Sequence, residues 1–297
     1  MTALTSLPVE LIVHIADING PASHAGLAFT CRYLAEAVQD LLKRHQAAYR
    51  DRQCSDIDPG TIPRVLKSVL NDSIAAYHVR AIRIWCTRMR WEHWRPVQLA
   101  EAEEGGDQSP SDSESDDEQL FTPWTFARRM ERRRDFFTRE EPLQPSLSTS
   151  DIEQYLSAMA HYLPDFGEDS PLREEARKEL ARGNDGFLKI LLALSCPRLD
   201  ALYFGRAHEE SARTSSGSGT SLQWLELVTM AHRDRDNSQW PPGLQALRHL
   251  ALSVETGTWL DEQEVSTGES WMPKLLNLPN LESLYFHGWR VEPDNED

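Results

Sequence analysis

An apolar template, L-x-x-L-x-[LF], recurs four times in the C-terminal third of the chain and constrains the fold more than any other feature. Its last two apolar positions are two residues apart, the spacing that places side chains on one face of a β-strand. The pattern therefore predicts four short strands with one buried face. Their apolar positions are Leu199, Leu202 and Phe204; Leu222, Leu225 and Leu227; Leu247, Leu250 and Leu252; and Leu281, Leu284 and Phe286.

The copies begin 23, 25 and 34 residues apart, and the first two intervals match the period of leucine-rich repeats, which is roughly 20–29 residues. An apolar helix is predicted over 186–195, and the segment HVRAIRIWC (78–86) fits the template as an upstream strand of the same sheet. We therefore expect an irregular, leucine-rich-repeat-like α/β solenoid over 53–297. Three further residues support the repeat, because each lies three positions before the start of a predicted strand: Cys196, Leu244 and Leu278.

One residue between the last two apolar positions of each strand points to the opposite face of the sheet. It is Tyr203, Glu226, Ala251 and Tyr285 in the four copies. In a curved repeat stack this face is usually the concave, ligand-contacting one. We interpret Tyr203, Glu226 and Tyr285 as a candidate substrate face. The alternative is that the aromatic rings cover gaps between irregular repeats.

The first fifty residues predict a compact helical unit. Apolar residues recur at three- and four-residue steps from Leu7 to Ile18, and 19–21 (NGP) ends that helix. Two more helices are expected, one from about Ser23 and a longer one to about Asp51. A unit below about 70–80 residues seldom has an adequate core of its own, so we expect it to pack against another surface.

The middle of the chain contains the clearest change in composition. Residues 101–119 hold nine acidic residues, four serines and no Lys or Arg, so they are expected to form a disordered acidic loop. Residues 55–60 (SDIDPG) are expected to be a linker. Helices are predicted over 62–71, 123–137, 150–163 and 170–182.

Three serines of the acidic loop are candidate phosphorylation sites. Ser111, Ser113 and Ser115 each lie three residues before a carboxylate, an arrangement that an acidophilic kinase could use. The alternative is an unmodified, solvated insertion, which is the interpretation we prefer.

Charge and composition exclude several classes of function. The chain has 297 residues and a net charge of −16, which opposes binding to nucleic acid. The sequence lacks HExxH, GxSxG, P-loop and GxGxxG motifs, so we expect no enzyme, no cofactor and no metal site. It also lacks a signal peptide and a long apolar run, so no membrane association is expected. Four dispersed cysteines indicate a reducing compartment, either cytoplasm or nucleus.

Two stretches, 83–96 and 126–137, interleave arginines with aromatic residues. Such stretches can stack on bases and neutralise phosphates. Because they flank the acidic loop, we expect pairing with that loop, or a solvated helix face, rather than nucleic-acid binding.

Two segments, LPVELIVHI and LAFTCRYLAEAV, resemble the F-box motif, and with them the chain looks like a fungal-type F-box protein. The F-box pattern is broadly L-P-x-E-[LI]-[LI]-x-x-I followed by a helix that ends in L-x-x-[VT]-C-[RK]. The resemblance covers roughly residues 5–50. The matching residues are Leu7, Pro8, Glu10, Leu11, Ile12, Ile15, Leu27, Cys31 and Arg32.

This resemblance implies a three-helix F-box over 1–52 that binds the Skp-type adaptor of a cullin–RING (SCF-type) ubiquitin ligase, while residues 53–297 bind a protein substrate. Two alternatives remain open: a non-catalytic scaffold that acts outside a ligase, and a plain helical hairpin packed on its own C-terminal domain. The residues that the resemblance places at the adaptor are Leu7, Pro8, Leu11, Ile12, Ile15, Cys31 and Arg32.

Overall fold

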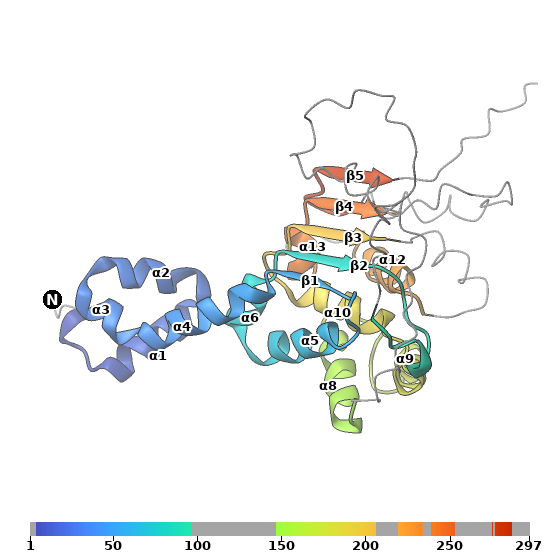
Figure 1. Ribbon diagram of the computed structural model, residues 1–297, viewed down its shortest axis with the longest axis horizontal. Coiled ribbons are helices and arrows are strands. Elements are labelled where there is room, and N and C mark those ends of the chain that lie inside the picture. The colour runs from blue at the N-terminus through green and yellow to red at the C-terminus, as the bar shows by residue number, and fades with distance from the viewer. Residues whose placement is uncertain are drawn as a thin grey trace, which may run out of the picture.

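The computed structural model describes residues 4–96, 147–205, 219–233, 239–252, 275 and 277–286 (Figure 1). These residues combine helices with one five-stranded sheet, in which the strands are adjacent in chain order and every neighbouring pair is parallel. The strands are β1 (Gln53–Ser55), β2 (Ala81–Ile84), β3 (Ala201–Phe204), β4 (His249–Leu252) and β5 (Ser283–Phe286).

The register of the sheet follows the apolar template. Ile82 of β2 lies opposite Leu202, Leu202 opposite Leu250, and Leu250 opposite Leu284. Three of the four predicted strands and the upstream strand are therefore confirmed, and equivalent template positions form one row across the sheet. The strand β1 was not predicted.

The second copy of the template, predicted as a strand, is a helix. Leu222, Leu225 and Leu227 lie in α12 (Ser221–His232), which begins where the Thr220 hydroxyl accepts a hydrogen bond from the Gln223 N–H at 3.2 Å. A three-residue step suits a helix as well as the template, and here Leu222, Leu225 and Val228 form the buried face, while Leu227 is exposed.

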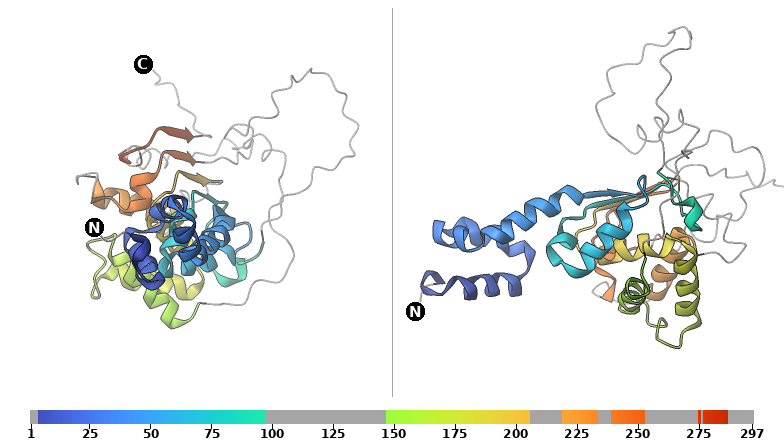
Figure 2. Two further views of the ribbon diagram at one scale, coloured as in Figure 1. Left: turned by 90° about the vertical axis from the view of Figure 1, so that its left-hand side faces the viewer. Right: turned by 60° about the horizontal axis from the view of Figure 1, so that its bottom comes forward.

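Helices cover one face of the sheet (Figure 2). At their centre, α10 (Gly186–Ser195) is buried over nearly its whole length, in agreement with a sequence that is apolar apart from Lys189 and the terminal Ser195. The helices expected over 62–71, 150–163 and 170–182 are confirmed as α5, α8 and α9, whereas 101–119 and 123–137 lie outside the described residues. The bounds of the covering helices are Thr61–Asn71 (α5), Thr149–Ala160 (α8), Pro171–Arg182 (α9) and Pro242–Ala246 (α13).

The N-terminal helices project away from the sheet, beyond α6 (Ser73–His78) (Figures 1 and 2). Where three helices were expected there are four, because the last one breaks at Val38, and the break directs the fourth helix toward α6. Short 3-10 turns lie at Leu4–Ser6, Tyr49–Asp51 and Trp91–His93. The four helices are α1 (Val9–Asn19), α2 (Pro21–Thr30), α3 (Arg32–Ala37) and α4 (Gln39–Ala48).

The segment 55–60 is not a linker, because Asp56 belongs to the interior. It is 0% exposed and joins Arg88, Asp185 and Lys189 in a buried cluster of two carboxylates and two cations. The Lys189 Nζ lies 2.7 Å from Asp56 Oδ2 and 2.9 Å from Asp185 Oδ1. The Arg88 Nη1 lies 3.3 Å from Asp56 Oδ2 and 3.5 Å from Asp185 Oδ2.

The interpretation of 83–96 as a solvated face is accordingly wrong for its central part. Arg88 is buried with Trp85 and Trp94, and it pairs with Asp56 and Asp185. Since these groups connect the ends of β1 and β2 to the start of α10, the cluster fastens the sheet to its central helix.

Candidate interaction surfaces

The N-terminal helices carry most of the exposed apolar surface. Among the described residues nine large apolar side chains are exposed, and seven of them lie between residues 4 and 49. The most exposed is Phe29 of α2, at 87%. Because seven of these nine exposed side chains belong to this one unit, we take it as a candidate interaction surface. The other exposed apolar residues of this unit are Leu4, Val9, Leu11, Ile18, Tyr33 and Tyr49.

The predicted adaptor residues at the start of α1 divide between this surface and the interior. Pro8 is exposed at the N-cap of α1, and Leu11 on the first turn is 49% exposed. Leu7 packs partly against the core of the helical unit, and its carbonyl accepts a hydrogen bond from the Tyr33 hydroxyl at 3.0 Å. Ile15 is half-buried. Pro8 and Leu11 can therefore contact a partner directly.

Ile12 is completely buried, so it positions α1 rather than contacting a partner. Cys31 is half-buried in the extended link between α2 and α3 and packs against the same core. Arg32 is exposed, and its Nε lies 2.8 Å from Glu36 Oε1 within α3.

Sequence reasoning missed the contributions of Val9, Phe29 and Tyr33 to this surface. Phe29 follows the buried Ala28, which lies one turn beyond the buried His24. The signal that could have identified Phe29 is its place directly after a buried residue. Successive residues of a helix point in directions about 100° apart, so a residue next to the buried face of α2 lies outside that face.

Three histidines form a hydrogen-bonded relay between the helical unit and α6. His24 Nε2 lies 3.1 Å from the carbonyl oxygen of Ala16, His24 Nδ1 lies 2.8 Å from His45 Nε2, and His45 Nδ1 lies 2.7 Å from His78 Nε2. A carbonyl only accepts, so His24 Nε2 carries a proton. In the neutral relay His45 then donates to His24, and His78 donates to His45.

The relay limits how many protons the three rings can bind. Each N–H···N bond holds one proton between two nitrogens, so four protons is the most that the intact relay accepts, one more than its neutral form. Burial, followed by the charges of His78, His24 and Arg44, lowers the pKa of His45 to about 4. Burial, followed by Arg198, lowers the pKa of His78. His45 and His78 therefore favour their uncharged forms.

The candidate substrate face is brought together only in part. Tyr203 of β3 and Tyr285 of β5 pack against Ala251 of β4 on the face of the sheet away from the helices, and both keep part of their surface exposed. The guanidinium of Arg83 lies 6.0 Å from the Tyr203 ring centre. Glu226 does not belong to this face, since it lies on α12. The candidate phosphorylation sites Ser111, Ser113 and Ser115 lie outside the described residues.

Three of the four thiols are buried in the core. Burial raises the pKa of Cys54 and Cys86 to about 12, and it raises the pKa of Cys196 well above its ordinary value. These thiols therefore act as apolar core groups rather than nucleophiles. Within the described ranges, no group of three or more His, Cys, Asp or Glu residues is arranged to hold a metal ion.

Comparison with known proteins finds no relative. No protein-family model matches the chain, and neither a curated protein nor a solved structure matches it. Among the residues that the structure describes, no helix combines the length and the apolar character needed to cross a bilayer.

Proposed function

We propose that this chain is the substrate-recognition subunit of an SCF-type cullin–RING ubiquitin ligase. Helices α1–α4 bind a Skp-type adaptor, and through it a cullin, while the sheet region binds a protein target. The chain works in the cytoplasm or nucleus and transfers nothing itself; it holds the target near the ubiquitin-conjugating enzyme. The observation that carries the proposal is the exposed apolar surface on α1–α4, which includes Pro8 and Leu11 of the F-box-like segments.

The energetics of that surface suit a stable complex. Fully burying a large apolar side chain contributes about 1.5–3 kcal/mol, and a few such anchors dominate most interfaces. Leu11 and Phe29 are both exposed and lie on separate helices of the projecting unit, so each is available to a partner.

The arrangement of the remainder supports a repeat-like platform. Parallel strands in chain order, with template positions in register, are what stacked leucine-rich-type units produce. The helical second copy, α12, makes the stacking irregular.

The adaptor-binding part can be tested with variants on the exposed surface. Binding of a purified fungal Skp-type adaptor to the full chain is measured by titration calorimetry for the wild type and for Pro8→Ala/Leu11→Ser. We expect at least a tenfold loss of affinity in this variant, from the lost apolar burial at Leu11. The matched control is Leu227→Ser/Met230→Ser, which removes two exposed apolar side chains from α12 and should bind normally.

Absence of binding by the folded wild type would overturn the proposal. Adaptor binding without ubiquitylation of a captured target in a reconstituted ligase would favour the scaffold alternative.

A further inference from the structure

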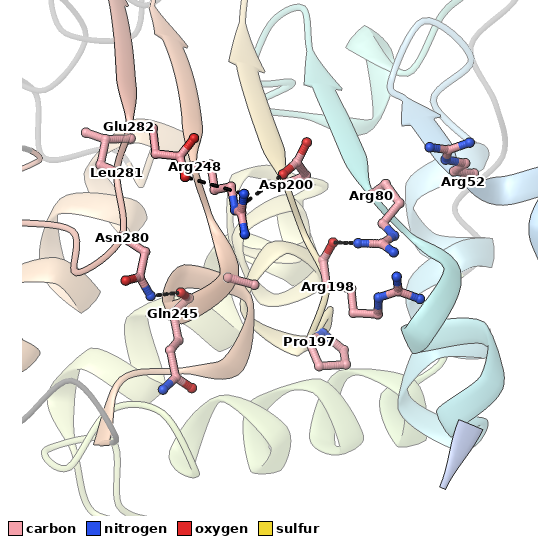
Figure 3. Close-up of a pocket in the computed structure, with 11 residues that line it drawn as sticks. Arg52, Arg80, Pro197, Arg198, Asp200, Gln245, Arg248, Asn280, Leu281 and Glu282 are labelled. Atoms are coloured by element: carbon pink, nitrogen blue, oxygen red, sulfur yellow. Dashed lines mark hydrogen bonds and ion pairs between the residues drawn. The ribbon is translucent and has the colours of Figure 1, made fainter. Parts of the chain in front are cut away.

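The residue directly before each strand forms a row along the edge of the sheet where the strands begin, the same side from which α1–α4 project (Figures 1 and 3). The backbone makes this row regular. For each of the first four row residues, the carbonyl accepts hydrogen bonds from the N–H of the next row residue and from that of the residue after it, at 2.8–3.2 Å. The row is Arg52, Arg80, Asp200, Arg248 and Glu282.

Charge is divided unevenly along this row. At the β4–β5 end, Arg248 has carboxylates on both sides: its Nε lies 4.0 Å from Asp200 Oδ1 and its Nη1 lies 3.4 Å from Glu282 Oε1. At the β1–β2 end, Arg52, Arg80 and the nearby Arg198 have no carboxylate within ion-pair distance among the described residues.

Neutral groups hold these three arginines in place. Arg80 Nη1 donates to the carbonyl of Arg198 at 3.2 Å, and the guanidinium of Arg198 lies 4.1 Å from the ring centre of Tyr77. Arg52 donates to the Tyr49 hydroxyl at 2.7 Å. Such contacts orient a guanidinium without neutralising it, so positive charge is concentrated here in a chain whose net charge is −16.

The row lines a groove of about 830 Å³ (Figure 3). Sites that enclose small organic ligands have volumes of roughly 300–1,000 Å³, so the groove is large enough for several functional groups of one ligand. Gln245, Asn280 and Leu281 line the part near Asp200 and Glu282. One end of the groove is therefore cationic, and the other offers amide, apolar and anionic groups.

We propose that this groove binds an acidic peptide segment of a partner protein, with its carboxylates on Arg52, Arg80 and Arg198. The planar fork of a guanidinium matches a carboxylate in two-point hydrogen bonding. A nucleic acid strand is anionic along its whole length and would meet Asp200 and Glu282, whereas a peptide can be acidic at one end and neutral or basic at the other. The inference is independent of the adaptor proposal.

The test uses fluorescence anisotropy on the full chain without adaptor. The probe is a labelled short peptide with Asp and Glu in one half and Gly and Ser in the other, beside a matched peptide with Asn and Gln in place of the acids. We expect the acidic peptide alone to bind, and Arg80→Gln/Arg198→Gln to weaken it at least tenfold. The control Arg90→Gln/Arg182→Gln removes the same charge from exposed positions near Trp91 and should change affinity less than twofold.

A second variant separates loss of the site from loss of folding. Asp200→Asn/Glu282→Gln removes the carboxylates that repel an acidic ligand and frees Arg248, so it should bind the acidic peptide several-fold more tightly. Equal weakening by both arginine double variants, or no binding by the wild type, would overturn the proposal. So would tighter binding of a single-stranded oligonucleotide that depends on Arg80 and Arg198.

Discussion

Lys189 lies fully buried in α10, and its ammonium group contacts Asp56, Asp185 and the carbonyl of Cys86. Burial by itself would lower the pKa of Lys189, but the neighbouring charges of Asp185 and Asp56 outweigh it and the pKa is raised. The lysine therefore stays charged, and with Arg88 it balances the two carboxylates. Removing one member leaves an uncompensated charge in the interior, which costs more than the pair itself contributes.

Asp56→Asn tests this balance. It leaves Lys189 and Arg88 with Asp185 as their remaining carboxylate in the cluster, so the free energy of unfolding should fall by about 3–5 kcal/mol in urea titrations. Asp58→Asn is the matched control, because the exposed Asp58 accepts from the Gly60 N–H at 2.9 Å and an amide oxygen can do the same. A loss in Asp56→Asn no larger than in the control would contradict the structural role of the cluster.

At the scale of elements, α2, α4 and α6 meet through the histidine relay. An ordinary histidine has a pKa of 6.5, whereas burial and neighbouring charges lower that of His45 to about 4. Between these two pH values His45 is protonated in the unfolded chain but uncharged in the folded chain. Acid therefore weakens the contact of α4 with α6, and neutral pH strengthens it. Charged or titratable neighbours of the relay are Arg44, Tyr49, Asp72, Tyr77 and Arg198.

The backbone amide hydrogens of α4 and α6 should therefore exchange faster at low pH. Hydrogen exchange of the α4 and α6 amides, corrected for intrinsic rates, should show a loss of stability on the order of 1 kcal/mol from pH 7 to pH 5, because solvent screens part of the effect. His45→Gln should flatten this pH dependence, whereas His14→Gln, on the exposed side of α1, should leave it unchanged. The same pH dependence in wild type and His45→Gln would show that the relay has no such effect.

For the molecule as a whole, the core of the N-terminal unit is completed by a residue from the platform. Ile74 of α6 is buried with Ile12, Leu34, Val38 and Leu41, and it belongs to this cluster rather than to the core beneath the sheet. The expectation that a fifty-residue unit packs against another surface is thus confirmed, and α6 provides that surface.

Ile74→Ala should loosen one part of the molecule and spare the other. Shortening a buried isoleucine to alanine lowers the free energy of unfolding by about 2–5 kcal/mol. Amide hydrogen exchange in α1–α4 should therefore accelerate, while β2 and α10 keep their protection. Leu66→Ala, a buried change in α5 beneath the sheet, should give the reverse pattern. Uniform acceleration in both variants would mean that the chain opens as one unit.

Sequence patterns predicted a helix correctly where residues typical of helix ends accompanied the apolar spacing. The helix 170–182 has Pro171 at its first position and Gly183 just after its end, where φ is 93°, and the structure matches it closely. The template at 222–227 failed because a three-residue apolar step is shared by helix and repeat. Only packing showed that Val228, rather than Leu227, belongs to the buried face.

From the sequence alone, four of the five strands and the helices with clear termini were predictable, because these depend on periods of two and 3.6 residues. The register of the strands came from the structure. Only the tertiary structure decided that Asp56 is buried against Lys189, that Glu226 leaves the sheet, and that Arg52, Arg80 and Arg198 share one groove. Charged residues recur at the second position of the template in the copies that contain β2 to β5, but the pattern does not show which of them pair with one another. Their partners are set by distances across the fold, and chain-order parallel strands bring together residues more than a hundred positions apart.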